Sequence, residues 1–467
     1  MKKYVFVLAL TLLSGSVFAV NINQGGYGEA VLLPYYTVNN GLNTLISVSN
    51  STDQVKAVKI NFREGKEGMN VLAFNLFLAP HDIWVAGLAS STSSLAGHEG
   101  EESTVLLTND TTCAPFLPQI QTFLPYEIDE GEDTDLSRSR EGYVEILEMG
   151  VLDPSYGLGL ASTLQYGVPV DCESVEKAYE EGGMWSSDGG DLSEQILPVT
   201  GGLSASASVI DVTEGALFAM ESIAFENFYP ADSQFHASPH DTEMPSLADA
   251  DTTSVLINNG EVIQSEWENG YQAVSAVLMK SQLESLFDVS PLVAGKTEMV
   301  LSFPTKRFYQ KDEAPFTLSD VSPETGCVTY EKSVFNRDSE QQCNEVYGCS
   351  FKTYKLSPIP PETDYQLCYG VNTLQWLFNQ TSQIDSPTEI LGSRSFAGRD
   401  FIIDSEAGKL VIDFSQSVTS SNSHDYMGLP VISMGFQKYT NSAAAAGLLA
   451  QYAGVNNTFY KSVIETD

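Results

Sequence analysis

Alternating hydrophobic and polar positions dominate the first hundred residues and predict a series of short β-strands. The segment 55–62 (VKAVKINF) alternates with a period of two, as a strand with one buried face does. Further strands are predicted at 30–38, 45–49, 71–78 and 83–88, separated by turns rich in Asn, Gly, Ser and Asp. Strands at this spacing are typical of a β-sandwich of the immunoglobulin-like type.

The rest of the chain continues this pattern and adds a few segments of helical character. Strands are predicted at 142–149, 298–303, 365–371, 409–414 and 429–438. Apolar positions recur at helical spacing in 173–185 and 271–287. The Ala-rich stretch 442–454 (SAAAAGLLAQYAG) predicts a short helix or an exposed lobe.

Together these elements predict a mainly β protein made of two immunoglobulin-like β-sandwich domains with helical and loop insertions. We place the N-terminal domain at 20–292 and the C-terminal domain at 293–467. The chain contains no repeat of fixed period, which argues against a solenoid or a propeller.

The first residues have the pattern of a secretory signal peptide. Lys2 and Lys3 precede an apolar run at 4–13, and small residues lead to Val17-Phe18-Ala19, which predicts a signal peptide of residues 1–19. The apolar run is shorter than the roughly 20 residues that span a bilayer, and the mature chain has no other candidate for a transmembrane segment. We therefore expect an exported protein, either extracellular or at the cell surface, with the periplasm as the alternative.

The charge of the chain excludes one large class of partners. It has 23 Lys and Arg against 61 Asp and Glu, a net charge of −38. Such a surface repels nucleic acid phosphates and anionic membranes, so nucleic acid is not an expected partner. The same surface attracts divalent cations, although adaptation to a salty medium explains the acidity equally well.

The six cysteines form an even set, which in an exported chain predicts three disulfides. Their clustering along the chain favours the pairs Cys113–Cys172, Cys327–Cys368 and Cys343–Cys349. A zinc site in the last four is disfavoured because the paired C-x2-C spacing of structural zinc sites is missing.

Several stretches carry a family resemblance, among them GYGEAVLLPYYTVN, TLISVSNSTDQVKAVKINFREG, FNLFLAPHDIWVAGL, REGYVEILEMG, AVSAVLM, LSFPTKRFY and GLPVISMGFQKYTN. With them the sequence resembles a family of uncharacterised secreted proteins from proteobacteria, over most of the mature chain. The resemblance implies export, a multi-strand architecture and pairing of Cys113 with Cys172 and of Cys327 with Cys368. It supplies no catalytic residue.

One segment, ADSQFHASPHDTEM, is a candidate metal site. His236 and His240 lie four residues apart, and Asp232 and Asp241 flank them, which is a ligand set that zinc, copper or nickel would accept. Pro239 argues against the helix that would direct both imidazoles at one ion. The alternative is a polar loop whose histidines bind nothing.

The acidic run 129–135 (DEGEDTD) is a candidate calcium site. Asp129, Asp133 and Asp135 supply the hard carboxylate oxygens that calcium prefers, so calcium is the one cofactor that we consider. The run lacks a regular D-x-D-x-D-G loop, and a solvated charge run is the alternative.

No catalytic motif is present. The chain lacks G-x-S-x-G and H-E-x-x-H, and it has five histidines in all. The aromatic residues Tyr27, Trp185, Trp267 and Tyr271 are interpreted as sugar-stacking rings or as core, and Trp84 and Trp376 as core. The adjacent pair Lys306 and Arg307 is expected to bind an anion or to pair with local acids.

These observations favour a non-enzymatic cell-surface or extracellular protein in adhesion, matrix or self-assembly. Its partners would be other surface proteins, a second copy of itself or a polysaccharide, bound by loops over a rigid frame or by strand edges. The alternatives are a secreted carbohydrate-active hydrolase or binding protein, and a periplasmic metal-binding protein.

Overall fold

The structure is a computed structural model that describes residues 19–125, 134–186, 195–258, 260–309, 313–316, 327–341, 365–380, 386–394, 400–445 and 448–466. Half of the chain is strand and 11% is helix, so the prediction of a mainly β protein is confirmed. Within these ranges no helix has both the length and the apolar character needed to cross a membrane. The predicted signal peptide, apart from Ala19, lies outside the described residues.

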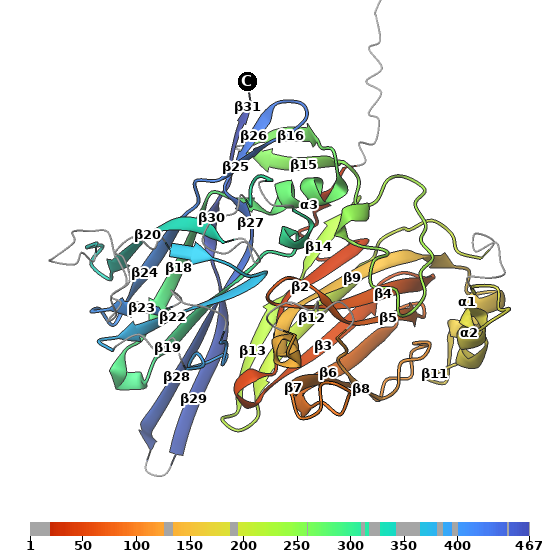
Figure 1. Ribbon diagram of the computed structural model, residues 1–467, viewed down its shortest axis with the longest axis horizontal. Helices are drawn as coiled ribbons and strands as arrows, with labels where there is room; N and C mark the ends of the chain where they lie inside the picture. Colours follow the sequence, from red (N-terminus) through yellow and green to blue (C-terminus); the bar gives the residue numbers. More distant parts are fainter. Residues whose placement is uncertain are drawn as a thin grey trace, which may run out of the picture.

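Two six-stranded antiparallel sheets come mainly from the first half of the chain (Figure 1). Sheet I has the strand order β1 (Asn21–Ile22), β14 (Ile223–Glu226), β2 (Ala30–Thr37), β9 (Glu141–Leu152), β4 (Val55–Glu64) and β5 (Asn70–Leu78). Sheet II has the order β13 (Ala216–Glu221), β12 (Leu203–Asp211), β3 (Leu42–Asn50), β6 (Ile83–Thr92), β7 (Glu102–Leu107) and β8 (Ile120–Thr122).

Three further sheets come from the second half. Sheet III has the order β21 (Tyr365–Leu367), β20 (Val328–Asn336), β24 (Ala407–Asp413), β18 (Gln282–Asp288) and β30 (Phe459–Lys461). Sheet IV has the order β23 (Asp400–Ile403), β22 (Val371–Phe378), β19 (Lys296–Ser302), β28 (Ile432–Ala445) and β29 (Leu448–Asn457). Sheet V consists of β25 (Ser417–Thr419), β26 (His424–Met427) and β31 (Val463–Thr466).

The remaining elements are short. The described two-stranded pairs are β10 (Leu164–Gln165) with β11 (Val168–Pro169), β15 (Thr253–Asn258) with β16 (Glu261–Glu266), and β17 (Met279–Lys280) with β27 (Leu429–Pro430). The described α-helices are α1 (Gly157–Ser162), α2 (Cys172–Tyr179) and α3 (Gly270–Leu278). Short 3-10 turns include η1 (Asn39–Gly41), η2 (Leu136–Arg140), η4 (Leu247–Asp249), η5 (Pro291–Val293) and η6 (Lys306–Phe308).

The prediction of two immunoglobulin-like sandwiches is wrong, because the strands form a five-bladed, β-propeller-like arrangement of sheets. The argument against a propeller from the lack of a repeat fails for a physical reason. The five larger sheets have six, six, five, five and three strands, and distant segments pair within them, such as Asn21 with Glu226. Unequal sheets built from non-consecutive strands impose no common period on the sequence.

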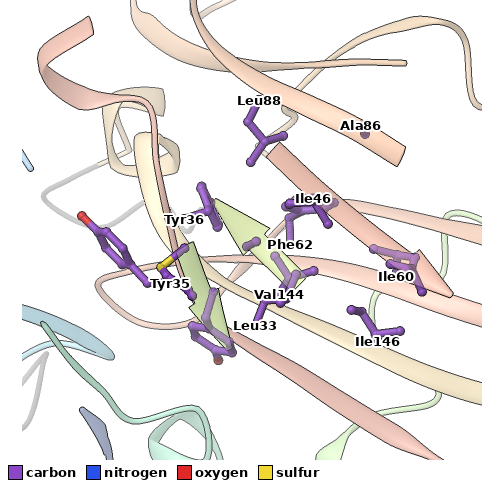
Figure 2. Close-up of a cluster of buried hydrophobic side chains, with 14 of the residues drawn as sticks. Leu33, Tyr35, Tyr36, Ile46, Ile60, Phe62, Ala86, Leu88, Val144 and Ile146 are labelled. Carbon is purple, nitrogen blue, oxygen red and sulfur yellow. The ribbon is translucent and has the colours of Figure 1, made fainter. Parts of the chain in front are cut away.

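The main hydrophobic core lies between sheets I and II and extends to Val300, Met434 and Phe436 of sheet IV. Figure 2 shows Ile60 and Phe62 of β4 on one side of this core and Ile46 of β3 and Leu88 of β6 on the other. All four side chains are buried. A second core joins sheets III and IV around Trp376, and α3 packs in a third core with residues of β2 and β14. The predicted core positions of Trp84 and Trp376 are confirmed.

The face of sheet I that points away from the main core carries charged side chains that are buried as well. Glu145 of β9 accepts a hydrogen bond from Arg63 Nε on β4 at 3.1 Å, and Arg307 Nη2 lies 3.4 Å from its other oxygen. Burial alone would raise the pKa of Glu145, but the two guanidinium groups outweigh it and hold this pKa below its ordinary value. The expectation that Arg307 pairs with a local acid is therefore confirmed.

Arg307 belongs to η6, directly after β19 of sheet IV, so its pair with Glu145 links sheets I and IV. We call this contact the seam. At the same place the β4–β5 turn meets the start of β22, where Val371 N donates to Gly65 O at 2.6 Å and Gly370 N donates to Lys66 O at 2.7 Å. Sheets I and IV are thus held by backbone hydrogen bonds as well as by a buried ion pair.

Two disulfides are present, Cys113–Cys172 and Cys327–Cys368, as the clustering of the cysteines predicted. The first fastens the segment after β7 to the start of α2. Cys343 and Cys349 lie outside the described residues, so their pairing stays a prediction.

The helical predictions are confirmed only in part. Helix α2 occupies the first half of 173–185, and α3 ends at Leu278, well before 287. From Gln282 the burial alternates with a period of two, and β18 begins there in sheet III. The described parts of the Ala-rich stretch, 442–445 and 448–454, lie in β28 and β29 and not in a helix, because the backbones of these two strands pair with each other.

The first described residues are inside the protein. Ala19 and Val20 are fully buried, Val20 N donates to Thr253 O at 2.8 Å, and Val255 N donates to Val20 O at 3.0 Å. Val20 thereby pairs with Ser254 of β15 and packs in the core around α3.

Removing the charge of Glu145 should destabilise the protein strongly. In Glu145→Gln two buried or nearly buried guanidinium groups lose their counter-ion, and breaking a buried pair in this way costs about 3–5 kcal/mol. Urea unfolding followed by tryptophan fluorescence measures the loss. Lys409→Met is the matched control, because it breaks a half-exposed pair with Glu284 and should cost under about 1 kcal/mol. Equal effects of the two variants would contradict this account of the seam.

Candidate functional site

The strongest candidate for a functional surface is the side of sheet II that points away from the main core. Because side chains alternate along a strand, every second residue of β3, β6, β7, β8, β12 and β13 points outward. We call these outward residues the open face. Its principal members are Asn43, Leu45, Ser47, Ser49, Ile83, Val85, Leu107, Ile120, Ser204, Ser206, Ser208, Ile210, Leu217, Ala219 and Glu221.

The open face exposes aliphatic side chains in a regular array. Six of them, Leu45, Ile83, Val85, Leu107, Ile120 and Leu217, are between 40% and 67% exposed. Contiguous exposed apolar groups of this kind mark interaction surfaces more often than isolated ones do.

Serines fill the centre of the open face and bond across neighbouring strands. The hydroxyls of Ser47 and Ser206 are 2.8 Å apart, and those of Ser49 and Ser204 are 2.7 Å apart. Each pair shares one hydrogen bond, so each of these hydroxyls keeps one partner when an apolar surface covers the face, although one O–H donor in each pair has no acceptor within the pair.

A groove of about 810 Å³ runs over part of the open face. Its floor includes Leu45 and Val85, and its rim is the loop 108–112 together with the β10–β11 hairpin. The rim is fixed in place: Thr108 Oγ1 donates to Val85 O at 2.7 Å, and Asp110 accepts from Val85 N at 2.9 Å. The Cys113–Cys172 disulfide begins directly after this loop and holds it against α2.

The electrostatics of the open face differ from those of the whole chain. The chain has 84 charged residues and a net charge of −38, but among the open-face residues given above only Glu221 is charged. Coulomb repulsion between two acidic molecules is therefore weakest where they approach through this face.

The candidate metal ligands of the 232–241 loop do not converge. No group of three His, Cys, Asp or Glu in the described part of the chain has the geometry to hold a metal. Instead, a cation of the protein already occupies the loop: Lys59 Nζ donates to Ser238 O at 2.6 Å and to Pro239 O at 3.2 Å.

Both histidines of this loop are packed and not poised for a metal. The ring of His236 stacks on Tyr179 with 5.6 Å between centroids and lies 5.9 Å from Trp185. Burial lowers the pKa of His236 to about 4, and the positive charge of Lys59 acts in the same direction. Burial and Lys59 also lower the pKa of His240. Asp241 caps a turn by accepting from Glu243 N and Met244 N, and Asp232 is exposed.

The candidate calcium run is only partly described. Asp129 and Asp133 lie outside the described residues, and Asp135 caps η2, where its side chain accepts from Ser137 N at 2.7 Å. Calcium at this run stays a prediction.

The four aromatic candidates fall into core residues and residues at the surface. Trp185 and Trp267 are buried, as the core interpretation has it, and Tyr271 stacks on Phe308. Tyr27 alone among the four is about half exposed. The described structure therefore does not bring these rings together into a sugar-stacking platform.

Sequence reasoning missed both the open face and the buried charges of sheet I. The segment LSASASVI at 203–210 could have indicated the open face. It alternates Ser with small apolar residues, so neither side of this strand segment is charged. The buried charges at Lys59, Arg63 and Glu145 gave no sign in the sequence, because alternation shows which side of a strand is polar but not whether another segment covers it.

Comparison of the chain with known proteins identifies no relative. The chain matches no protein family model, no curated protein and no solved structure. The resemblance to secreted proteobacterial proteins therefore stays a prediction.

The packing of His236 predicts acid-sensitive stability. Because its pKa in the folded state lies below that of the unfolded chain, its contribution is present above about pH 6.5 and is lost as the pH falls towards 4. We expect His236→Phe, which keeps the ring contacts, to reduce the loss of stability between pH 7 and pH 4 by about 1–2 kcal/mol, discounted for partial exposure. Urea midpoints across this pH range measure it. His81→Phe, at an exposed histidine, is the control and should retain the full pH dependence.

Proposed function

We propose that this protein is exported and works outside the cytoplasm as a non-enzymatic surface or extracellular protein that assembles with copies of itself through the open face. The proposal rests on one observation: the open face of sheet II exposes aliphatic side chains and carries almost no charge. In a chain of net charge −38, this is the side on which a second copy meets the least repulsion.

The size of the open face is sufficient for a weak to moderate interface. Six strands about 4.8 Å apart and about seven residues long give a flat area of roughly 600 Å² per copy. Two copies would bury about 1,200 Å², which is the lower limit of specific protein interfaces. Burial of apolar surface at about 25 cal/mol per Å² then supplies the driving force.

The other functions considered from the sequence have less support. The 232–241 loop holds Lys59 where a metal would bind, which removes the motive for a metal-binding function. The aromatic candidates for a carbohydrate-active hydrolase or binding protein do not gather into one platform among the described residues, because Trp185 and Trp267 are buried and Tyr271 stacks on Phe308.

The test is the mass in solution of the purified mature protein, measured by light scattering over a range of concentrations at 50 mM and 500 mM NaCl. We expect association that strengthens with salt, because salt screens the repulsion between like-charged copies and leaves apolar burial intact. Calcium and chelator should give the same mass, since the open face offers a single carboxylate.

A pair of matched variants locates the interface. Val85→Glu places a charge in the middle of the open face and should weaken association at least tenfold. Val262→Glu makes the same change at an exposed valine of the β15–β16 hairpin, away from the open face, and should leave association unchanged. A monomer under all conditions, or an equal loss in both variants, would refute the proposal.

A further inference from the structure

A second concave site lies at the seam between sheets I and IV, independent of the open face. It is a cleft of about 560 Å³. We call it the seam cleft. Lys66, Arg138 and Arg140 line it from the sheet I side, and Tyr369 and Arg394 line it from the sheet IV side. Ligand sites are common where two packed units meet, because both can contribute side chains to one cavity.

The lining of the seam cleft carries both signs of charge, with five Asp or Glu and four Lys or Arg. Four of its fifteen lining residues are Lys or Arg, against 23 such residues among the 467 of the chain. Two of the four are neutralised locally, since Arg138 pairs with Glu64 at 3.0 Å and Arg140 pairs with Glu102. Arg394 is exposed and has no ion-pair partner among the described residues, so its guanidinium group is available to a ligand.

Carboxylates line the same cleft. Glu99, Glu102, Asp135 and others give it acceptors for hydrogen bonds, and the half-buried ring of Tyr369 gives it an apolar surface. These acids would repel a small simple anion. A neutral sugar would give the guanidinium group of Arg394 no anionic partner. A sugar that carries an acidic group satisfies both halves of the lining: its anionic group meets arginine, and its hydroxyls donate to carboxylates.

We propose that the seam cleft binds an acidic saccharide, with Arg394 holding the carboxylate of a uronate residue. Lys66 lines the same cleft, with its ammonium group 5.9 Å from the centre of the Tyr369 ring, and adds a second positive charge. The carboxylates of Glu99 and Glu102 then accept the sugar hydroxyls. The cleft does not overlap the open face, so this inference does not rest on self-assembly.

The test is titration calorimetry of the full mature protein with digalacturonate. We expect binding that weakens as NaCl rises from 50 to 500 mM, because the contact with Arg394 is ionic. Maltose is the neutral probe of equal size and sodium sulfate is the simple anion, and each should bind at least tenfold more weakly than digalacturonate. No binding of digalacturonate at millimolar concentration would overturn the proposal, and so would equal binding of maltose or of sulfate.

Matched arginine variants assign the site. Arg394→Gln should weaken digalacturonate binding at least tenfold without changing the urea midpoint, since this side chain is exposed and supports no described contact. Arg337→Gln, at another exposed arginine, should bind as wild type does. Equal affinity of Arg394→Gln and wild type would place the saccharide elsewhere and refute the assignment. Val85→Glu separates the two proposals, because it should lose self-association and keep saccharide binding.

Discussion

The ionised carboxylate of Glu145, enclosed between Arg63 and Arg307, is the interaction on which the arrangement of the two halves depends. A buried carboxylate is tolerable only with its charge balanced, and here the balance comes from two different sheets. Sheet I supplies Glu145 and Arg63, while Arg307 follows β19 of sheet IV. The ion pair therefore joins these sheets, together with the backbone bonds from the start of β22 to the carbonyls of Gly65 and Lys66 and the packing of Phe436 on Tyr35.

The distribution of charge connects the fold with the candidate sites. Several of the few basic residues are used inside the protein: Lys56 pairs with the buried Glu148, Lys59 bonds to loop carbonyls, and Lys306 bonds to Cys368 O. The outside is left strongly acidic. Against that background, a face whose principal members include one charged residue, and a cleft whose Arg394 has no ion-pair partner among the described residues, are departures, and each favours a different class of partner.

The sequence predicted local structure well and assembly poorly. Strands such as β4 and β5, the core tryptophans and two disulfide pairs could be recognised because alternation, hydrophobicity and cysteine spacing are local properties. Strand pairing depends on contacts between distant segments, such as Ser206 with Ser47, and no local pattern shows these. The helical periodicity at 271–287 misled for a related reason, because a helix and a strand are joined there with only β17 between them.

The site predictions failed where chemistry was inferred from composition alone. Two histidines four residues apart suggested a metal, but Lys59, 180 residues earlier than Pro239, supplies the cation instead. The open face escaped notice because serine, alanine and valine carry no recognisable chemistry. The open face is unusual because the chain that carries it has a net charge of −38.

The burial of Ala19 and Val20 has a consequence for the signal peptide that the sequence predicts. The bond between them is the one at which the sequence predicts removal of the signal peptide, and in the folded protein both residues are buried and Val20 bonds to Thr253 and Val255. A peptidase therefore reaches this bond only where the chain has opened locally. We expect cleavage of the predicted signal peptide to precede the docking of Val20 beside β15.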